Sequence, residues 1–103
     1  MVKKEIREII KEYVKKLNEK SIPIEKAILF GSQSNGTAKV DSDIDLMLVT
    51  QDRIPKKISS RTAWLTADEI DYRIEPIVVT KSKYEANDTV LVDLVHKTGI
   101  SIS

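Results

Sequence analysis

Three short apolar stretches, separated by polar segments, most constrain what this chain can fold into. They cover residues 26–30, 43–50 and 70–80. The first two have the length of a strand, and the third alternates between apolar and polar residues before it becomes apolar. The third contains Pro76, which suits an edge strand or a bulge. The three stretches therefore predict a sheet of at least three strands.

Amphipathic segments flank these predicted strands. Apolar residues recur at intervals of three and four between residues 2 and 17, which predicts a helix. A charged segment over residues 53–68 is expected to form a second helix, whose inner face would be Ile58, Ala63, Trp64 and Leu65. A last helix, lined by Val90, Leu91, Leu94 and Val95, would end at Gly99. The pattern predicts a small α+β or α/β fold.

The composition limits the functions that such a fold could carry. With 103 residues we expect one domain over residues 1–103. A net charge of +1 argues against a dedicated DNA-binding module. The chain has no cysteine and one histidine, His96, which excludes disulfides, thiol nucleophiles and histidine-rich metal sites. No apolar run approaches the roughly 20 residues of a membrane span, so we expect a cytoplasmic protein without a membrane partner.

Two carboxylates stand at the start of the second predicted strand. Asp43 and Asp45 are two residues apart, so their side chains share one face. The two carboxylates repel each other, and their closeness would become favourable if a divalent cation bound between them. Carboxylate oxygens suit Mg²⁺, which also takes phosphate oxygens of a substrate. The alternative is a solvated strand end or a turn.

A small, polar loop precedes this pair. Gly31 and Ser32 directly follow the first predicted strand, and Gly36 comes shortly after. Glycine lets the backbone approach a ligand closely, and backbone N–H groups with a hydroxyl can bind phosphate. Taken alone, a Gly-Ser after a strand is also an ordinary turn. A phosphate loop beside paired carboxylates is what phosphoryl-type transfer requires.

These residues form a recognisable compound motif. Leu-Phe-Gly-Ser at residues 29–32, then ten residues, then Asp-Ile-Asp-Leu at residues 43–46, resembles the signature of the DNA polymerase β nucleotidyltransferase superfamily. The spacing is similar to that of its minimal nucleotidyltransferase branch, which includes MntA-like antitoxins. The resemblance implies the small nucleotidyltransferase fold, a mixed sheet flanked by helices.

The resemblance also implies a third carboxylate on a following strand. Asp71 and Glu75 are the two possibilities, with Arg73 between them. We favour Glu75 because it lies deeper in the predicted strand, between Ile74 and Pro76. The alternative is that Asp71, Arg73 and Glu75 form a solvated strand face with an ion pair.

The mechanism implied is two-metal transfer of a nucleoside monophosphate, AMP from ATP in the simplest case. Asp43 and Asp45 would hold two Mg²⁺ ions, and Glu75 would complete the shell of the second ion. Gly31, Ser32 and nearby backbone N–H groups would hold the β- and γ-phosphates. Ser42 would orient the loop before Asp43, although a plain turn role fits it equally.

The implied acceptor lies outside the chain. Members of the minimal branch resemble antitoxins that adenylylate a small helical HEPN-type toxin, commonly on a tyrosine. Two alternatives stay open: a non-catalytic module of the same fold that masks its partner, and a transferase for a small molecule. Lys56, Lys57 and Arg61 form a basic stretch that is either a solvated helix face or a docking surface. Nucleic acid is not an expected partner, and self-association is left open.

Overall fold

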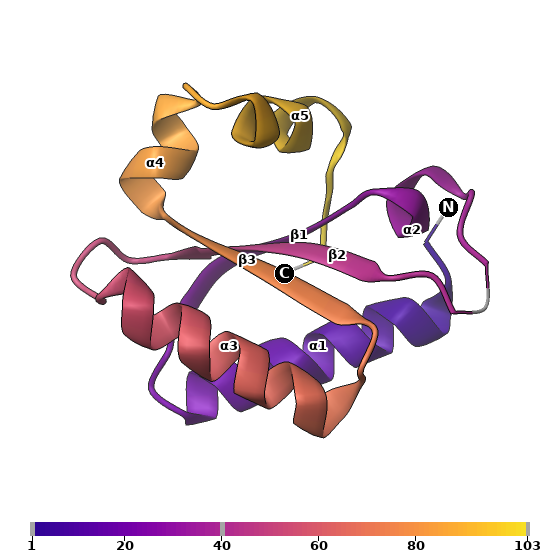
Figure 1. The fold of residues 1–103 in the computed structure, drawn as a ribbon, viewed down its shortest axis with the longest axis horizontal. Helices are drawn as coiled ribbons and strands as arrows, with labels where there is room; N and C mark the ends of the chain where they lie inside the picture. The colour runs from indigo at the N-terminus through magenta and orange to yellow at the C-terminus, as the bar shows by residue number, and fades with distance from the viewer. Residues whose placement is uncertain (1, 40, 103) are drawn as a thin grey trace.

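A four-stranded sheet forms the centre of the computed structural model, which describes residues 2–39 and 41–102. Its strands are β1 (Ile24–Phe30), β2 (Ile44–Thr50), β3 (Ile74–Thr80) and β4 (Ile100–Ser101), in the order β3-β2-β1-β4 (Figure 1). β1 runs antiparallel to both β2 and β4, whereas β2 and β3 are parallel. The mixed sheet with flanking helices confirms the predicted fold class.

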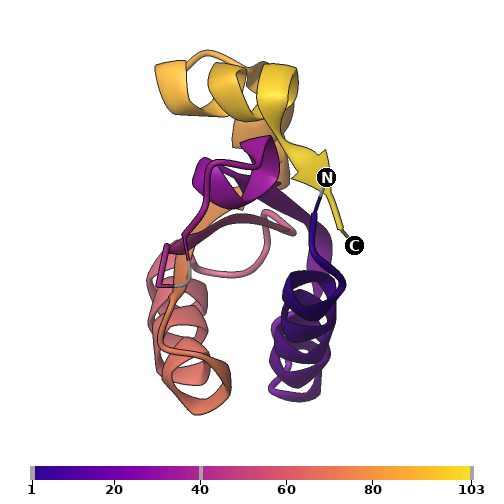
Figure 2. The ribbon, with the colours of Figure 1, turned by 90° about the vertical axis from the view of Figure 1, so that its right-hand side faces the viewer.

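Two long helices cover one face of the sheet. α1 (Lys4–Glu19) and α3 (Lys56–Ile70) lie beside each other beneath it (Figure 2). α3 also forms the crossover that parallel neighbouring strands require. The hydroxyl of Tyr13, a fully buried residue of α1, donates a hydrogen bond of 2.6 Å to the carbonyl of Ala63 in α3. The main core fills the space between these helices and the sheet, with Ile6, Ile10, Leu17, Leu29, Leu46, Leu48 and Ile74 among its members.

Two short helices cover the opposite face. α4 (Lys81–Ala86) follows β3 directly, and α5 (Val90–Thr98) lies above the sheet (Figure 1). Their buried side chains form a second apolar cluster with β1 and β2, made of Ile28, Phe30, Met47, Val49, Tyr84, Val92 and Val95. His96 of α5 stacks on Tyr84 of α4, with the ring centroids 4.1 Å apart. This stacking ties the two helices together.

The inner face of α3 differs from the sequence prediction. Ala63 is buried as expected, but Ile58, Trp64 and Leu65 are 49–56% exposed. Because α3 packs closely against α1 and β3, its buried positions are taken by small residues. These are Ser59, Ala63, Thr66 and Ala67. The prediction that Trp64 belongs to the core is therefore wrong. None of the helices in the described parts of the chain combines the length and apolar character of a membrane span.

The third strand is shorter than predicted. α3 continues to Ile70, a turn follows, and β3 begins only at Ile74. β3 is an edge strand, which confirms the position expected from Pro76. α2 (Ser32–Asn35) is a single helical turn within the polar loop after β1, whereas β4 was not predicted. A strand of two residues is too short to leave a periodic pattern in the sequence.

Candidate active site

Three carboxylates meet at one end of the sheet. Asp43 precedes β2, Asp45 is the second residue of β2, and Glu75 is the second residue of β3. Asp45 and Glu75 are direct neighbours across the parallel β2–β3 ladder, so their side chains share a face. One oxygen from each of the three carboxylates lies within 4.8 Å of the others. The structure thus brings Glu75 to the pair Asp43 and Asp45, as the sequence analysis expected.

The charges of this cluster repel one another. Burial, followed by the neighbouring Asp43, raises the pKa of the Asp45 carboxyl above its ordinary value. The pKa of Glu75 is raised by burial and then by Asp43 and Asp45. A divalent cation would relieve this repulsion, and an all-carboxylate donor set fits a hard ion such as Mg²⁺. The residues present therefore fit the metal that the sequence predicts.

Gly31 connects the glycine loop to the carboxylates. Its φ of 74° lies in the left-handed region that favours glycine. A Cβ atom added at this position would collide with Oδ2 of Asp45. The loop backbone therefore lies directly against the carboxylate cluster, and Ser32 follows as the first residue of α2.

Hydrogen bonds hold the loop in shape. The buried Gln33 donates from Nε2 to the carbonyl of Ser42 at 3.2 Å, linking α2 to the turn before Asp43. The Ser42 hydroxyl accepts from the backbone N–H of Lys39 at 2.7 Å and closes that turn. These two bonds connect Ser42, the residue before Asp43, to Gln33 and to Lys39. Sequence reasoning missed Gln33, because nothing in the pattern sets it apart from its polar neighbours.

Asp71 lies outside the carboxylate cluster. It caps the C-terminus of α3 instead of sharing the β3 face with Glu75. The Arg73 side chain donates to it from Nη2 to Oδ2 at 2.9 Å and from Nε to Oδ1 at 3.1 Å, and the backbone N–H of Arg73 also donates to Oδ1, at 2.9 Å. These bonds hold the pKa of Asp71 below its ordinary value. Of the two possibilities for a third carboxylate, the structure brings only Glu75 to the aspartate pair.

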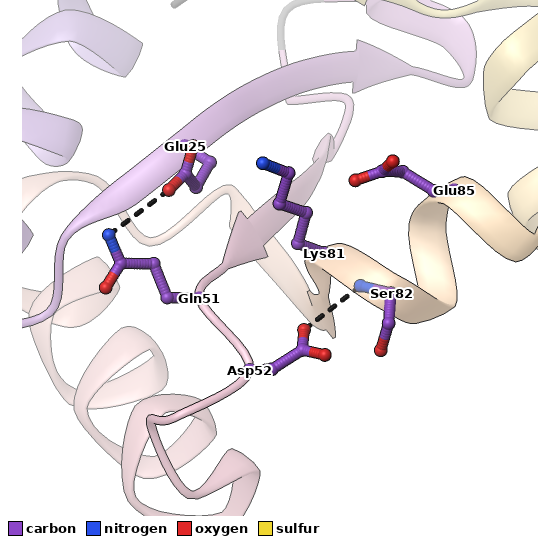
Figure 3. Close-up of a pocket in the computed structure, with 6 residues that line it drawn as sticks. All are labelled: Glu25, Gln51, Asp52, Lys81, Ser82 and Glu85. Carbon is purple, nitrogen blue, oxygen red and sulfur yellow. Dashed lines mark hydrogen bonds between the residues drawn. The ribbon is translucent and has the colours of Figure 1, made fainter.

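A broad hollow of about 620 Å³ lies at the other end of the sheet (Figure 3). It lies beside Gln51 and Asp52, which follow the last residue of β2, whereas Asp45 stands near its start. Four of its lining residues already bind one another in pairs. Gln51 donates to Glu25 at 3.2 Å, and the backbone N–H of Ser82 donates to Asp52 at 3.0 Å. We therefore assign this hollow no part in the candidate site.

Comparisons with known proteins agree with this geometry. A family model described as polymerase beta, nucleotidyltransferase, matches residues 6–103. A toxin–antitoxin crystal structure with AMP-PNP is 26% identical, with a TM-score of 0.64 over 89% of this chain and 71% of the other. A mutant MntA–HpeT toxin–antitoxin complex has 21% identity and a TM-score of 0.66, over 90% and 71% of the two chains.

A candidate nucleotidyltransferase from Sulfolobus solfataricus has the same fold. It is 18% identical, with a TM-score of 0.63 over 94% of this chain and 78% of the other. The comparison with curated proteins gave no match. The family match spans nearly the whole described chain and includes the glycine loop and all three carboxylates. The chain belongs to the polymerase β nucleotidyltransferase family, and its structural neighbours include MntA-type toxin–antitoxin proteins.

Proposed function

We propose that the chain is a cytoplasmic, metal-dependent nucleotidyltransferase that moves AMP from ATP to an acceptor hydroxyl, with residues 1–103 as one domain. The observation that carries this proposal is the meeting of Asp43, Asp45 and Glu75 within 4.8 Å, beside the glycine loop. Phosphoryl-type transfer needs both a cation site and a phosphate cradle. Family membership supports the reaction class, and AMP-PNP in a related structure supports ATP.

The carboxylates would hold the metal. Asp43 and Asp45 would bind two Mg²⁺ ions, and Glu75 would complete the shell on the acceptor side. When bound, the ions supply charge neutralisation for pyrophosphate and lower the pKa of the acceptor hydroxyl. Gly31 and Ser32 would hold the β- and γ-phosphates through backbone N–H groups and the serine hydroxyl. Ser42 and Gln33 would fix the turn that presents Asp43.

In the transfer step the acceptor oxygen attacks the α-phosphorus. A new oxygen–phosphorus bond forms, the bond between the α-phosphorus and the bridging oxygen breaks, and pyrophosphate leaves. The hydroxyl proton passes to the Glu75 carboxylate or to solvent.

A protein is the acceptor that we favour, specifically a hydroxyl on a small helical HEPN-type toxin partner. Asp43 and Glu75 are both exposed, so the site opens to the surface where a docked protein could deliver a side chain. The similarity to toxin–antitoxin complexes supports this choice. The second candidate is a module that masks its partner without transfer, because the toxin–antitoxin neighbours are complexes and binding alone could silence a toxin.

Labelled nucleotide tests the proposal. The chain would be incubated with Mg²⁺, ATP labelled in the α-phosphate, and the protein encoded beside it. We expect label on that protein with the parent chain and none with Asp43→Asn. Asp41→Asn is the matched control, because Asp41 is exposed in the same loop, where it accepts a hydrogen bond from Tyr72. A tight complex that forms without label and survives Asp43→Asn would establish the masking function instead.

A further inference from the structure

The outer face of α3 is apolar at its centre. Ile58 and Leu65 are each 56% exposed, and Trp64 is 49% exposed. They are three of the seven large hydrophobic residues that the described structure leaves exposed, more than any other element carries. Because an α-helix has 3.6 residues per turn, Ile58 and Leu65 lie in one row, two turns apart. The helix, about 22 Å long, thus presents an apolar row that the fold leaves uncovered.

Charged side chains of opposite sign flank this apolar centre. Lys56, Lys57 and Arg61 stand in the first two turns of α3, and Asp68 and Glu69 stand in its last turn. All five side chains are exposed. Among the described residues, the salt bridges include neither the three cations nor Asp68. The outer face is therefore basic at one end and acidic at the other, with most of these charges unpaired within the fold.

This distribution of charge opposes the dipole of α3. A helix is partially positive at its N-terminus and partially negative at its C-terminus, so acidic side chains are favourable in the first turn and basic ones in the last. α3 has no acidic residue in its first turn and no basic residue in its last turn. Lys57 and Asp68 each stand at the less favourable end. An antiparallel neighbour of the same sequence would bring each end of α3 beside the opposite charge.

The pattern is complementary to itself when it is reversed. Lys57 lies five residues before Thr62, and Asp68 lies six residues after it. Ile58 and Leu65 lie four residues before and three residues after the same point. Two antiparallel copies of α3 related by a two-fold axis near Thr62 would therefore set Lys57 opposite Asp68 and Ile58 opposite Leu65. A two-fold interface requires such matching, because the same surface patch meets itself.

We propose that the chain forms a two-fold symmetric homodimer through the outer face of α3. The apolar row forms the centre of the contact, and the charged pairs form its rim. Near the axis, Arg61 of each copy stacks on Trp64 of the other. Asp45 shares a strand face with Met47 and Val49, which pack against α4 and α5. The carboxylate cluster therefore lies on the opposite face of the sheet from α3, and both copies keep it open.

Charge reversal tests the antiparallel pairing. By sedimentation velocity we expect the parent chain to pass from monomer to dimer between about 5 and 500 µM, as suits a small interface. Lys57→Glu and Asp68→Lys should each raise the dimer dissociation constant about fivefold or more, because each places two like-charge pairs in the contact. The chain with both substitutions should return to within about twofold of the parent.

Mixing the two single variants gives the sharpest readout. Each variant repels itself, but an equimolar mixture of Lys57→Glu and Asp68→Lys should associate more tightly than either alone, since their charges match across the mixed pair. Lys57→Glu also places an acidic residue in the first turn of α3, so its melting temperature should not fall. That result separates loss of pairing from loss of folding.

The apolar centre is tested by Leu65→Ser. This variant should raise the dissociation constant about tenfold or more, because the leucine is removed from both halves of the contact. Val90→Ser is the matched control, because Val90 is 90% exposed on α5, across the sheet from α3, and should change the constant less than about twofold. The emission of Trp64 should shift to shorter wavelength with concentration in the parent chain and not in Leu65→Ser.

Four outcomes would overturn the dimer. The first is a parent chain that stays monomeric up to about 500 µM. The second is a dimer that Leu65→Ser leaves unchanged, which would place the contact elsewhere. Single charge variants that fail to associate when mixed would exclude the antiparallel register. If Leu65→Ser weakens only a complex with the protein encoded beside the chain, the face belongs to that protein. None of these outcomes affects the proposed transfer site, since Mn²⁺–nucleotide binding should be the same in Leu65→Ser as in the parent.

Discussion

The backbone of Gly31 lies directly against the carboxylate of Asp45, so that a side chain at position 31 would displace a residue of the carboxylate cluster. Gly36, five residues later, has a similar φ of 79° but no heavy atom within 4 Å of an added Cβ. The two glycines therefore share a backbone requirement and differ in what surrounds them.

Alanine at these two glycines separates strain from function. Both Gly31→Ala and Gly36→Ala should lose about 1–2 kcal/mol of unfolding free energy from the left-handed backbone. Only Gly31→Ala should also weaken Mn²⁺–nucleotide binding, by about tenfold or more, because the Asp45 carboxylate must move. Urea unfolding and calorimetry measure the two effects. Equal metal affinity in the two variants would show that the loop is only a turn.

Metal should stabilise the folded chain. At a metal–nucleotide concentration about 100 times the dissociation constant, binding should add about 2.7 kcal/mol to the unfolding free energy. Asp43→Asn combined with Asp45→Asn should abolish this gain, while the metal-free protein should melt no lower than the parent, because a repulsive pair has been removed. Thermal melts with and without Mn²⁺ and α,β-methylene-ATP provide the measurement. A gain that survives the double substitution would place the metal elsewhere.

Acidification should act on metal affinity and on stability in opposite directions. The folded-state pKa values of Asp45 and Glu75 lie above their ordinary values. The folded state therefore binds these protons more tightly than the unfolded state, and the metal-free protein gains stability from this cluster as pH falls through the raised values. Metal competes with the same protons, so Mn²⁺ affinity should fall over that window. Titrations at a series of pH values test this, with Glu75→Gln as a variant that flattens both trends.

Glu75 and Asp71 should respond differently to loss of charge. Glu75→Gln should abolish transfer with little change in nucleotide binding, because its proposed role lies on the acceptor side. Asp71→Asn should keep most activity but lose about 1–2 kcal/mol of stability, since Arg73 loses a charged partner. Single-turnover assays and urea unfolding distinguish the two variants. Greater loss of activity at Asp71 would reverse the assignment.

A buried hydrogen bond should contribute to holding α1 against α3. Tyr13→Phe removes the donor that binds the Ala63 carbonyl at 2.6 Å and should cost about 1–2 kcal/mol. Tyr72→Phe is the control, because Tyr72 is exposed and its bond to Asp41 should contribute less than about 0.5 kcal/mol. Chemical unfolding of both variants gives the comparison. Equal losses would mean that the buried bond adds nothing beyond its exposed counterpart.

The carboxylate cluster was largely predictable from the sequence. Asp43 and Asp45 share a face by strand alternation alone, and the glycine loop ends a strand that pairs with theirs. Glu75 needed the family resemblance to be noticed, because alternation offered Asp71 equally. Glu75 and Asp71 differ because β3 begins only at Ile74, which leaves Asp71 outside the strand. The boundaries of helices and strands are the features that local sequence determines least well.

The helix packing was less predictable, because size and burial are not the same property. Large apolar residues suggested an inner face for α3, yet the helix approaches α1 and β3 so closely that small residues fill the contact. The cavity of about 340 Å³ beside Ile77, between β3 and α5, left no pattern either. It exists because α5 is placed over β3 by contacts of Val92 and Val95 with strands distant in the chain.

The position of Trp64 gives this protein a built-in optical reporter. It is the chain's single tryptophan and is 49% exposed on the outer side of α3. α3 covers the face of the sheet opposite to α4 and α5 (Figure 2). Its emission should therefore shift when another protein covers α3 and stay constant when metal and nucleotide bind at the carboxylates. Fluorescence of the unmodified chain can thus follow the binding of a partner at α3 separately from the loading of the nucleotide.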